Sequence, residues 1–269
     1  MFDNANGIRY LIFFLGGGGG RGIYGFCGFS LEKLHEYKNK YEYKYEYKYE
    51  YKYNHFIIFM KSFDHACSLG TLCHAAAILK RNKVKMASYP FDWIFSDCDI
   101  VNHCIKDNFK TFLDKNNYTT ISHSSCGNTV YNIYMFNHHN PLINEEHYNY
   151  FTRCVNRFND LIKHPGPKLF VMMFINMSCG AGAGDHDYLS KNKEKIIDFN
   201  DEFSKYVNNY TLLIIFHLPE KSANHHKFTY NNNVHFLELH TISRSNGNDF
   251  DSNVDNIYLD EILNEKYFF

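Results

Sequence analysis

Cys73 is the residue whose position in the sequence most strongly indicates chemistry. It follows Gly70 and Thr71, in a pattern that predicts a strand, a tight turn and a helix with Cys73 in its first turn. The unpaired N–H groups and the positive dipole end of a helix N-terminus lower the pKa of a thiol and favour the thiolate. The same N–H groups could hold the oxyanion that forms when a thiolate attacks a carbonyl. The alternative is a small buried residue on a helix flank, and we interpret Cys67, inside the strand, as structural.

A cysteine nucleophile needs a base, usually a histidine, and the chain contains 16 His residues. His138 and His139 follow an expected strand at the mouth of a loop, where functional groups are often found. His217 ends an expected buried strand, and strand carboxyl ends line the ligand crevice of an open α/β sheet. His217 is therefore a candidate binding residue. For each histidine alone, a role on the surface or in the core is the alternative.

Asp92 and Trp93, the only tryptophan of the chain, lie in the aromatic segment 89–93. Asp92 is either a buried acid that orients a catalytic group or a loop carboxylate bonded to the local backbone. Trp93 is a candidate binding residue beside it.

Metal and cofactor binding are weaker interpretations. The sequence contains no CxxC, HxxxH or HExxH pattern, so we expect no metal. The glycine-rich stretch 180–184 follows an expected strand and precedes an expected helix, as a phosphate-binding loop does. It does not match GxGxxG and no GK[ST] follows, so we expect no nucleotide cofactor.

The composition is that of a globular protein, with 45% hydrophobic residues and a formal net charge of -1 over 269 residues. There is no basic excess that would indicate nucleic acid, and no stretch is long enough to span a membrane. Partners are not indicated. The 8 Cys residues come without a convincing secretory signal, so we expect them to be reduced and the protein to be intracellular.

Residues 1–59 have low complexity, with five consecutive glycines and a nearly perfect Tyr-Glu-Tyr-Lys repeat. We interpret this part as a disordered extension whose tyrosines could support weak self-association. From about Met60 onward the pattern becomes regular. We therefore predict a single α/β domain over residues 60–269.

Strands are predicted over residues 62–68, 128–137, 168–175, 211–218 and 234–239. Helices are predicted from Thr71, as N-cap, to about residue 81, from residue 97, and over 145–162, 191–207 and 256–264. Alternation of buried strands with helices favours a mostly parallel sheet flanked by helices in three layers.

Several segments together resemble a known family. They are residues 68–73, 88–93 and 136–139, with Arg153 and residues 157–158. In this order they are similar to a family of unknown function in large DNA viruses and bacteria, described as putative papain-like cysteine peptidases. The resemblance covers the chain from about residue 60 and places the protein in a host cytoplasm or a virion rather than outside cells.

The resemblance implies Cys73 as nucleophile, His139 or its neighbour His138 as base, and Asp92 as an acidic member of the site. Arg157 becomes a candidate binding residue. The usual His-Asp pair of the family appears here as His139 and Asn140, which leaves the orienting partner open.

A papain-like α+β fold, with a helical half against an antiparallel barrel-like half, is the alternative to the α/β sheet. Three functions follow. The first is a cysteine peptidase or related thiol hydrolase or acyltransferase. The second is an α/β enzyme acting on sugars or nucleotides without a cysteine nucleophile, in which Asp92 and His217 matter more. The third is a non-catalytic viral structural or interaction protein.

Overall fold

The computed structural model describes residues 61–177, 185–220 and 222–268. The expectations for residues 1–59 and for the stretch 180–184 lie outside the described residues. The described residues 61–62 and 265–268 belong to one compact unit, and residues 63–264 form another. In the first, β1 (Lys61–Ser62) pairs in parallel with β10 (Tyr267–Phe268). That residues 60–269 form a single domain stays a prediction.

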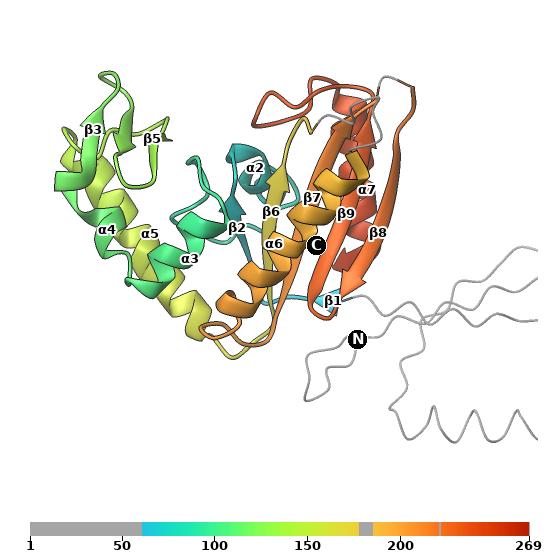
Figure 1. Cartoon of the computed structure of the whole chain (residues 1–269), viewed down its shortest axis with the longest axis horizontal. Coiled ribbons are helices and arrows are strands. Elements are labelled where there is room, and N and C mark those ends of the chain that lie inside the picture. The colour runs from blue at the N-terminus through green and yellow to red at the C-terminus, as the bar shows by residue number, and fades with distance from the viewer. Residues whose placement is uncertain (1–60, 178–184, 221, 269) are drawn as a thin grey trace, which may run out of the picture. The chain divides into compact units, whose positions relative to one another are not determined.

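The second unit is built on a five-stranded sheet with the order β2-β6-β7-β9-β8 (Figure 1). The first four strands in this order run parallel, and β8 is antiparallel to β9. The sheet confirms the expected α/β class, and the described residues contain no antiparallel barrel-like half of the papain kind. The strands are β2 (His65–Gly70), β6 (Lys168–Phe174), β7 (Tyr210–Pro219), β8 (His225–Asn231) and β9 (Val234–Thr241).

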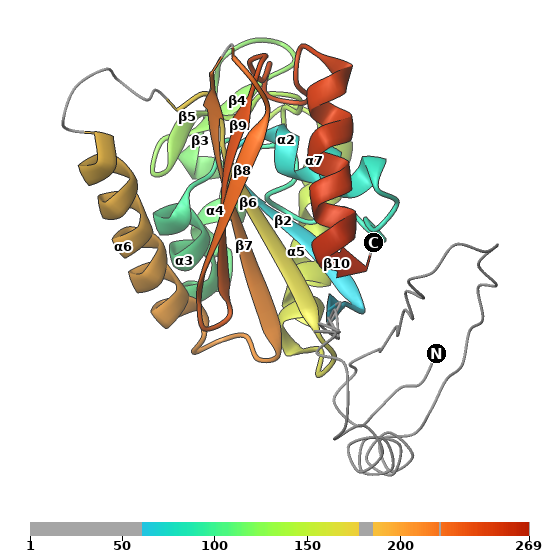
Figure 2. The ribbon, with the colours of Figure 1, turned by 90° about the vertical axis from the view of Figure 1, so that its right-hand side faces the viewer.

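Helices cover both faces of this sheet. Figure 2 shows α6 and α3 on one side of the strands and α7 on the other. Arg81 of α2 forms an ion pair with Asp260 of α7. None of the helices in the described ranges has the length and apolar character needed to cross a membrane. The described helices are α2 (Cys73–Arg81), α3 (Cys98–Lys106), α4 (Lys110–Leu113), α5 (Glu145–Lys163), α6 (Asp185–Phe203) and α7 (Asn253–Lys266), with a short 3-10 turn η1 (Lys115–Asn117).

The long connection between β2 and β6 contains a small antiparallel sheet, which we call the β3–β5 lobe. Its strands are β3 (Tyr118–Thr120), β4 (Cys126–Asn128) and β5 (Asn132–Phe136). The sequence predicted one strand over 128–137. This prediction was wrong at its start, because a turn separates the end of β4 at Asn128 from the start of β5 at Asn132. There the side chain of Asn128 accepts hydrogen bonds from two backbone N–H groups and closes the turn.

An aromatic cluster joins this connection to the sheet. Phe158 of α5 lies with its ring centroid 5.5 Å from that of Phe91, 5.7 Å from that of Phe109 and 6.3 Å from that of Phe170 on β6. All four side chains are fully buried. Aromatic pairs at such distances add to the free energy of apolar burial. The aromatic segment 89–93 is thus anchored in the core.

Truncation of Phe158 tests this anchoring. Phe158→Ala should lower the free energy of unfolding by about 3–5 kcal/mol, because it removes a buried ring shared by three partners. Urea denaturation measures the change. Tyr134→Ala, on β5 with 56% of the residue exposed, is the matched control. It should change stability by about 0.5 kcal/mol or less. Equal stability of both variants would show that the cluster does not hold the connection.

Candidate active site

The turn that precedes Cys73 depends on Gly70. Its φ of 93° lies in the left-handed region, and a Cβ there would sit 1.8 Å from Oγ of Ser96. Ser96 holds the turn, because its Oγ donates to the Leu69 carbonyl at 2.8 Å and its N–H to the Thr71 carbonyl at 3.2 Å. Only glycine satisfies both the backbone angle and the close approach.

Helix α2 begins at Cys73, as the sequence predicted, but Thr71 is not its N-cap. The N-cap is Leu72, which supplies no capping side chain. Thr71 instead donates its hydroxyl hydrogen bond to the Met173 carbonyl on β6, at 2.7 Å. The hydroxyl fixes the turn to the neighbouring strand, while the N-cap leaves the first N–H groups of α2 without a side-chain acceptor.

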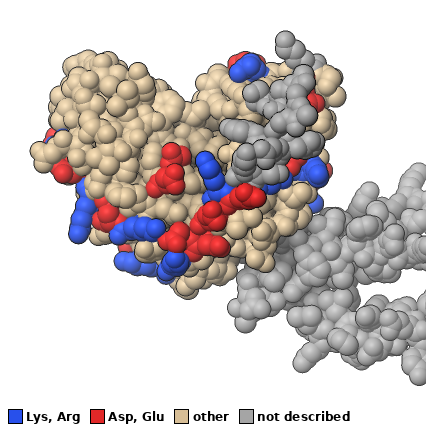
Figure 3. Space-filling view, in the orientation of Figure 1, with Lys and Arg blue, Asp and Glu red and all other residues tan. Residues whose placement is uncertain are grey.

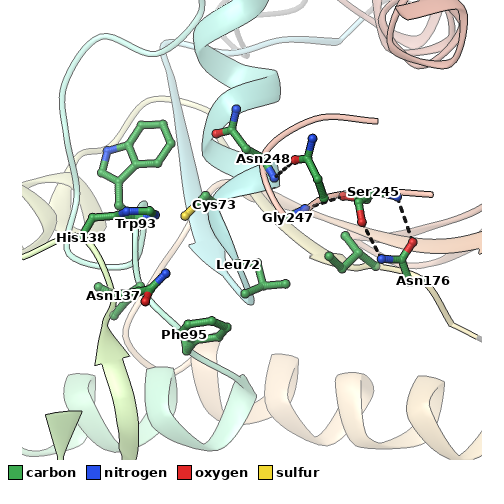
Figure 4. Close-up of a pocket in the computed structure, with 13 residues that line it drawn as sticks. Leu72, Cys73, Trp93, Phe95, Asn137, His138, Asn176, Ser245, Gly247 and Asn248 are labelled. Carbon is green, nitrogen blue, oxygen red and sulfur yellow. Dashed lines mark hydrogen bonds between the residues drawn. The ribbon is translucent and has the colours of Figure 1, made fainter. Parts of the chain in front are cut away.

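A pocket of about 380 Å³ opens at Cys73 (Figure 4). The sulfur of Cys73 points to the side where Trp93 and His138 lie. In Figure 3 the surface is hollowed between the β3–β5 lobe and the rest, and the visible face of the lobe is almost free of charged side chains. The lining contains no Asp, Glu, Lys or Arg. It consists of Leu72, Cys73, Trp93, Ile94, Phe95, Asn137, His138, Ile175, Asn176, Ser245, Asn246, Gly247 and Asn248.

The pKa of the Cys73 thiol is raised, contrary to the expectation from the helix N-terminus. Burial is the main cause, and the negative charge of Asp92 acts in the same direction. The backbone N–H of Cys73 opposes them and lowers the pKa, as expected for the first turn of a helix. Burial outweighs this effect, so the thiol needs a base to become a nucleophile.

The two adjacent histidines point to different places. His138 is exposed and lines the pocket. His139 instead stacks on Tyr150 of α5, with ring centroids 4.9 Å apart, and its buried Nδ1 has no hydrogen-bond partner. Burial lowers the pKa of His139 to about 4. The structure therefore brings Cys73, His138 and Trp93 together in one pocket and turns His139 toward α5.

Asp92 is fully buried behind the pocket and is not among its lining residues. Its carboxylate pairs with Lys85 and accepts the backbone N–H of Tyr89 at 2.7 Å. Burial raises the pKa of Asp92 to about 6, and Lys85 works against this shift. These bonds are those of a loop carboxylate, the second of the two alternatives. A catalytic role for Asp92 stays a prediction.

His217 supports the pocket from behind. Its Nδ1 accepts the N–H of Asn176 at 3.1 Å, so the proton is on Nε2, which donates to Thr241 at 2.7 Å. Burial lowers its pKa to about 4. His217 is thus a neutral connector between the ends of β6 and β9. It touches a pocket residue and does not line the pocket.

Arg157 and Asn140 do not line the pocket, and their side chains hydrogen-bond to backbone carbonyls of neighbouring segments. Arg157 is exposed on α5 and donates to the Ser88 carbonyl at 3.3 Å, at the start of the aromatic segment. The side-chain amide of buried Asn140 donates to the carbonyls of Ser122 and Ser125 within the β3–β5 lobe. Asn140 therefore stabilises the lobe, and its hydrogen bonds do not involve the imidazole of His138 or His139.

The sequence analysis did not predict the pocket wall that lies opposite His138, which contains Asn176 and Ser245. Asn176 and Ser245 are joined reciprocally, the Asn176 amide to the Ser245 carbonyl at 2.6 Å and the Ser245 N–H to the Asn176 amide oxygen at 2.9 Å. Oγ of Ser245 accepts the N–H of Gly247 at 3.1 Å. The Ser-Asn-Gly-Asn stretch 245–248 after a buried strand was the available signal, because loops after parallel strands line the crevice of such sheets.

The geometry defines a class: an α/β protein with a cysteine at the start of a helix and a histidine in the same pocket. Residues 64–197 match the model of a family described as "putative papain-like cysteine peptidase". The match confirms the resemblance seen in the sequence and ends within α6. Neither the curated proteins nor the solved structures gave a match to the chain.

Two buried histidines should make the fold sensitive to acid. Burial lowers the pKa of His217 to about 4 and that of His74, whose Nδ1 lies 2.7 Å from Oγ of Ser245, to about 3. The unfolded chain takes up these protons near the ordinary histidine pKa of 6.5, whereas the folded protein does not. Their contribution to stability is therefore complete above about pH 6.5 and is lost progressively as the pH falls toward about 4.

Urea unfolding at about pH 7.5, 6 and 5 measures this dependence. His217→Gln should be less stable than the parent at neutral pH, but its stability should fall less between about pH 7 and 5. Identical slopes for variant and parent would contradict the neutral state of His217.

Proposed function

We propose that the pocket is the active site of a thiol-dependent hydrolase or acyltransferase, with Cys73 as nucleophile and His138 as base. One observation carries the proposal: Cys73 and His138, from distant parts of the chain, line the same pocket. The family description supports peptidase-like chemistry. The position of Cys73 at the first residue of α2 supplies N–H groups for an oxyanion.

The reaction would proceed in two displacements. His138 takes the proton of Cys73 as the sulfur bonds to the substrate carbonyl carbon, and the N–H groups at the start of α2 bind the oxyanion. The carbonyl bond to the leaving group then breaks, and the leaving amine or alcohol takes the proton from His138. Water, or another acceptor, attacks the thioester and regenerates the thiol.

His138 is favoured over His139 by exposure and by position. Cys73 and His138 do not share a hydrogen bond in the structure, which describes both of them. Such contacts often tighten only when substrate binds, and an exposed side chain in the turn after β5 is able to rotate toward the sulfur. His139 would have to leave its stacking contact with Tyr150.

The lining of the pocket supports an uncharged acyl substrate. Its wall contains Asn137, Asn176, Asn246 and Asn248, and no Asp, Glu, Lys or Arg. Amide side chains both donate and accept hydrogen bonds, which suits the N–H and C=O groups of a peptide or another amide. Trp93 offers an apolar face to a side chain of such a substrate.

The same Trp93 and asparagines favour a second candidate, an α/β enzyme that acts on a sugar without a cysteine nucleophile. Aromatic faces and amide groups also suit neutral, hydroxyl-rich ligands. The non-catalytic interaction protein is a third candidate. It predicts no pocket that joins Cys73, Asp92 and a histidine, and Asp92 is not among the lining residues, although Cys73 and His138 share the pocket.

Reactivity of the cysteines tests the pair. Iodoacetamide should modify Cys73 faster than buried cysteines such as Cys67 and Cys104. His138→Ala should lower the rate at Cys73 by about tenfold or more near neutral pH, because the base that deprotonates the thiol is lost. Mass spectrometry of digested protein measures the rate at each position. His139→Ala is the matched control and should leave the rate at Cys73 unchanged. The reverse pattern would make His139 the base.

An activated ester separates the two candidate functions. p-Nitrophenyl acetate should give a burst of about one nitrophenolate per chain as Cys73 becomes acetylated, followed by slower turnover. Cys73→Ala should abolish the burst and the acetylation of this position, both followed by absorbance and mass spectrometry. An unchanged burst in Cys73→Ala would rule out the cysteine mechanism and leave the second candidate.

A further inference from the structure

A second group of functional side chains lies away from the pocket, at the end of the sheet where β7 and β9 stop and β8 begins (Figure 1). It consists of Glu220, His225 and His240, none of which lines the pocket. His225 and His240 are directly opposite each other in the β8–β9 pair. Glu220 follows β7 and is fixed by its N–H, which donates to the Thr241 carbonyl at 2.7 Å. Three strands therefore bring these side chains together.

The potential ligand atoms converge. One carboxylate oxygen and one nitrogen from each ring all lie within 4.8 Å of one another. Nδ1 of His240 is 2.5 Å from Oε1 of Glu220, and Nε2 of His225 is 3.9 Å from Oε2. The two imidazole rings stack with centroids 4.0 Å apart and planes 11° apart.

The contact between His240 and Glu220 is not an ordinary hydrogen bond. Nδ1 of His240 is buried and has no hydrogen-bond partner of proper geometry, although the carboxylate oxygen is close. A buried polar atom without such a partner is costly, and a cation bound by both side chains would supply the missing partner. The side chains of His240 and Glu220 are 14% and 32% exposed, so such a cation would be partly shielded from water.

We propose that Glu220, His225 and His240 bind a divalent transition-metal cation of the zinc class. Two imidazole nitrogens and one carboxylate oxygen suit zinc, cobalt, nickel or copper, whereas calcium and magnesium prefer oxygen ligands alone. Three protein ligands leave a position for water, and His225, with 56% of its side chain exposed, lies on the open side.

The proposed ion would fasten the edge of the sheet. Strand β8 is mostly exposed and pairs in the sheet only with β9. An ion held by β8, β9 and the end of β7 joins this edge strand to two parallel strands. The site goes beyond the proposed thiol chemistry and does not depend on it.

The experiment uses the full chain, freed of metal with a chelator and then titrated with Zn²⁺ by calorimetry and with Co²⁺ by visible absorption. About one equivalent should bind, and the cobalt spectrum should lack a thiolate charge-transfer band. His225→Ala and Glu220→Gln should each weaken binding by about tenfold or more, since loss even of outer partners of a metal site costs that much. Added Zn²⁺ should raise the melting temperature of the parent chain and not that of His225→Ala.

Two control variants test whether zinc binds at Glu220, His225 and His240 rather than at a neighbouring histidine or at Cys73. His226→Ala changes the next residue of β8, whose Nδ1 contacts the Tyr258 hydroxyl, and should bind zinc like the parent. Cys73→Ser should also bind normally. The proposal is overturned if the parent takes up no zinc, if His225→Ala binds as tightly as the parent, or if Cys73→Ser loses the ion.

Discussion

The pocket depends on the left-handed turn at Gly70 and on Ser96, which fills the space where a side chain would be. Ser96 binds the backbone on both sides of this turn and thereby ties it to the aromatic segment. One residue earlier, the N–H of Phe95 donates to the Met135 carbonyl on β5, at 3.1 Å. This single path of hydrogen bonds links the start of α2 to the strand that leads into His138. Cys73 and His138, from distant parts of the chain, are thus held at the same pocket.

The opposite wall of the pocket is held by two buried histidines that do not line the pocket themselves. His217 and His74 are buried, with lowered pKa values, and hydrogen-bond to Asn176 and Ser245 as neutral rings. Phe250 lies against both, with centroids 4.8 Å and 4.6 Å away. Histidines in this chain therefore differ in role according to their position in the fold. His217 and His74 are buried supports, whereas His138 is exposed at the pocket.

The sequence predicted the helices and strands in which buried apolar residues follow a regular pattern. Strands β6, β7 and β9 read as apolar runs, α5 has a clear periodicity, and Cys73 was placed at the helix start. Strand β8 was missed, because an exposed edge strand of polar residues has no such pattern. The raised pKa of Cys73 was also out of reach, since burial is a property of the folded chain. For the same reason no metal motif marks Glu220, His225 and His240, which come from three strands.

The hydrogen bonding within the β3–β5 lobe has a consequence for the stability of the pocket. The lobe carries Asn137 and His138, and Asn140 fastens its loops through backbone carbonyls of the lobe itself. Few-stranded sheets of this size open at a lower free energy than a buried parallel core. Mild denaturant should therefore separate His138 from Cys73 while β2, β6, β7 and β9 remain paired. The pocket would then open and form again by a local equilibrium, with the main sheet as the template on which it reassembles.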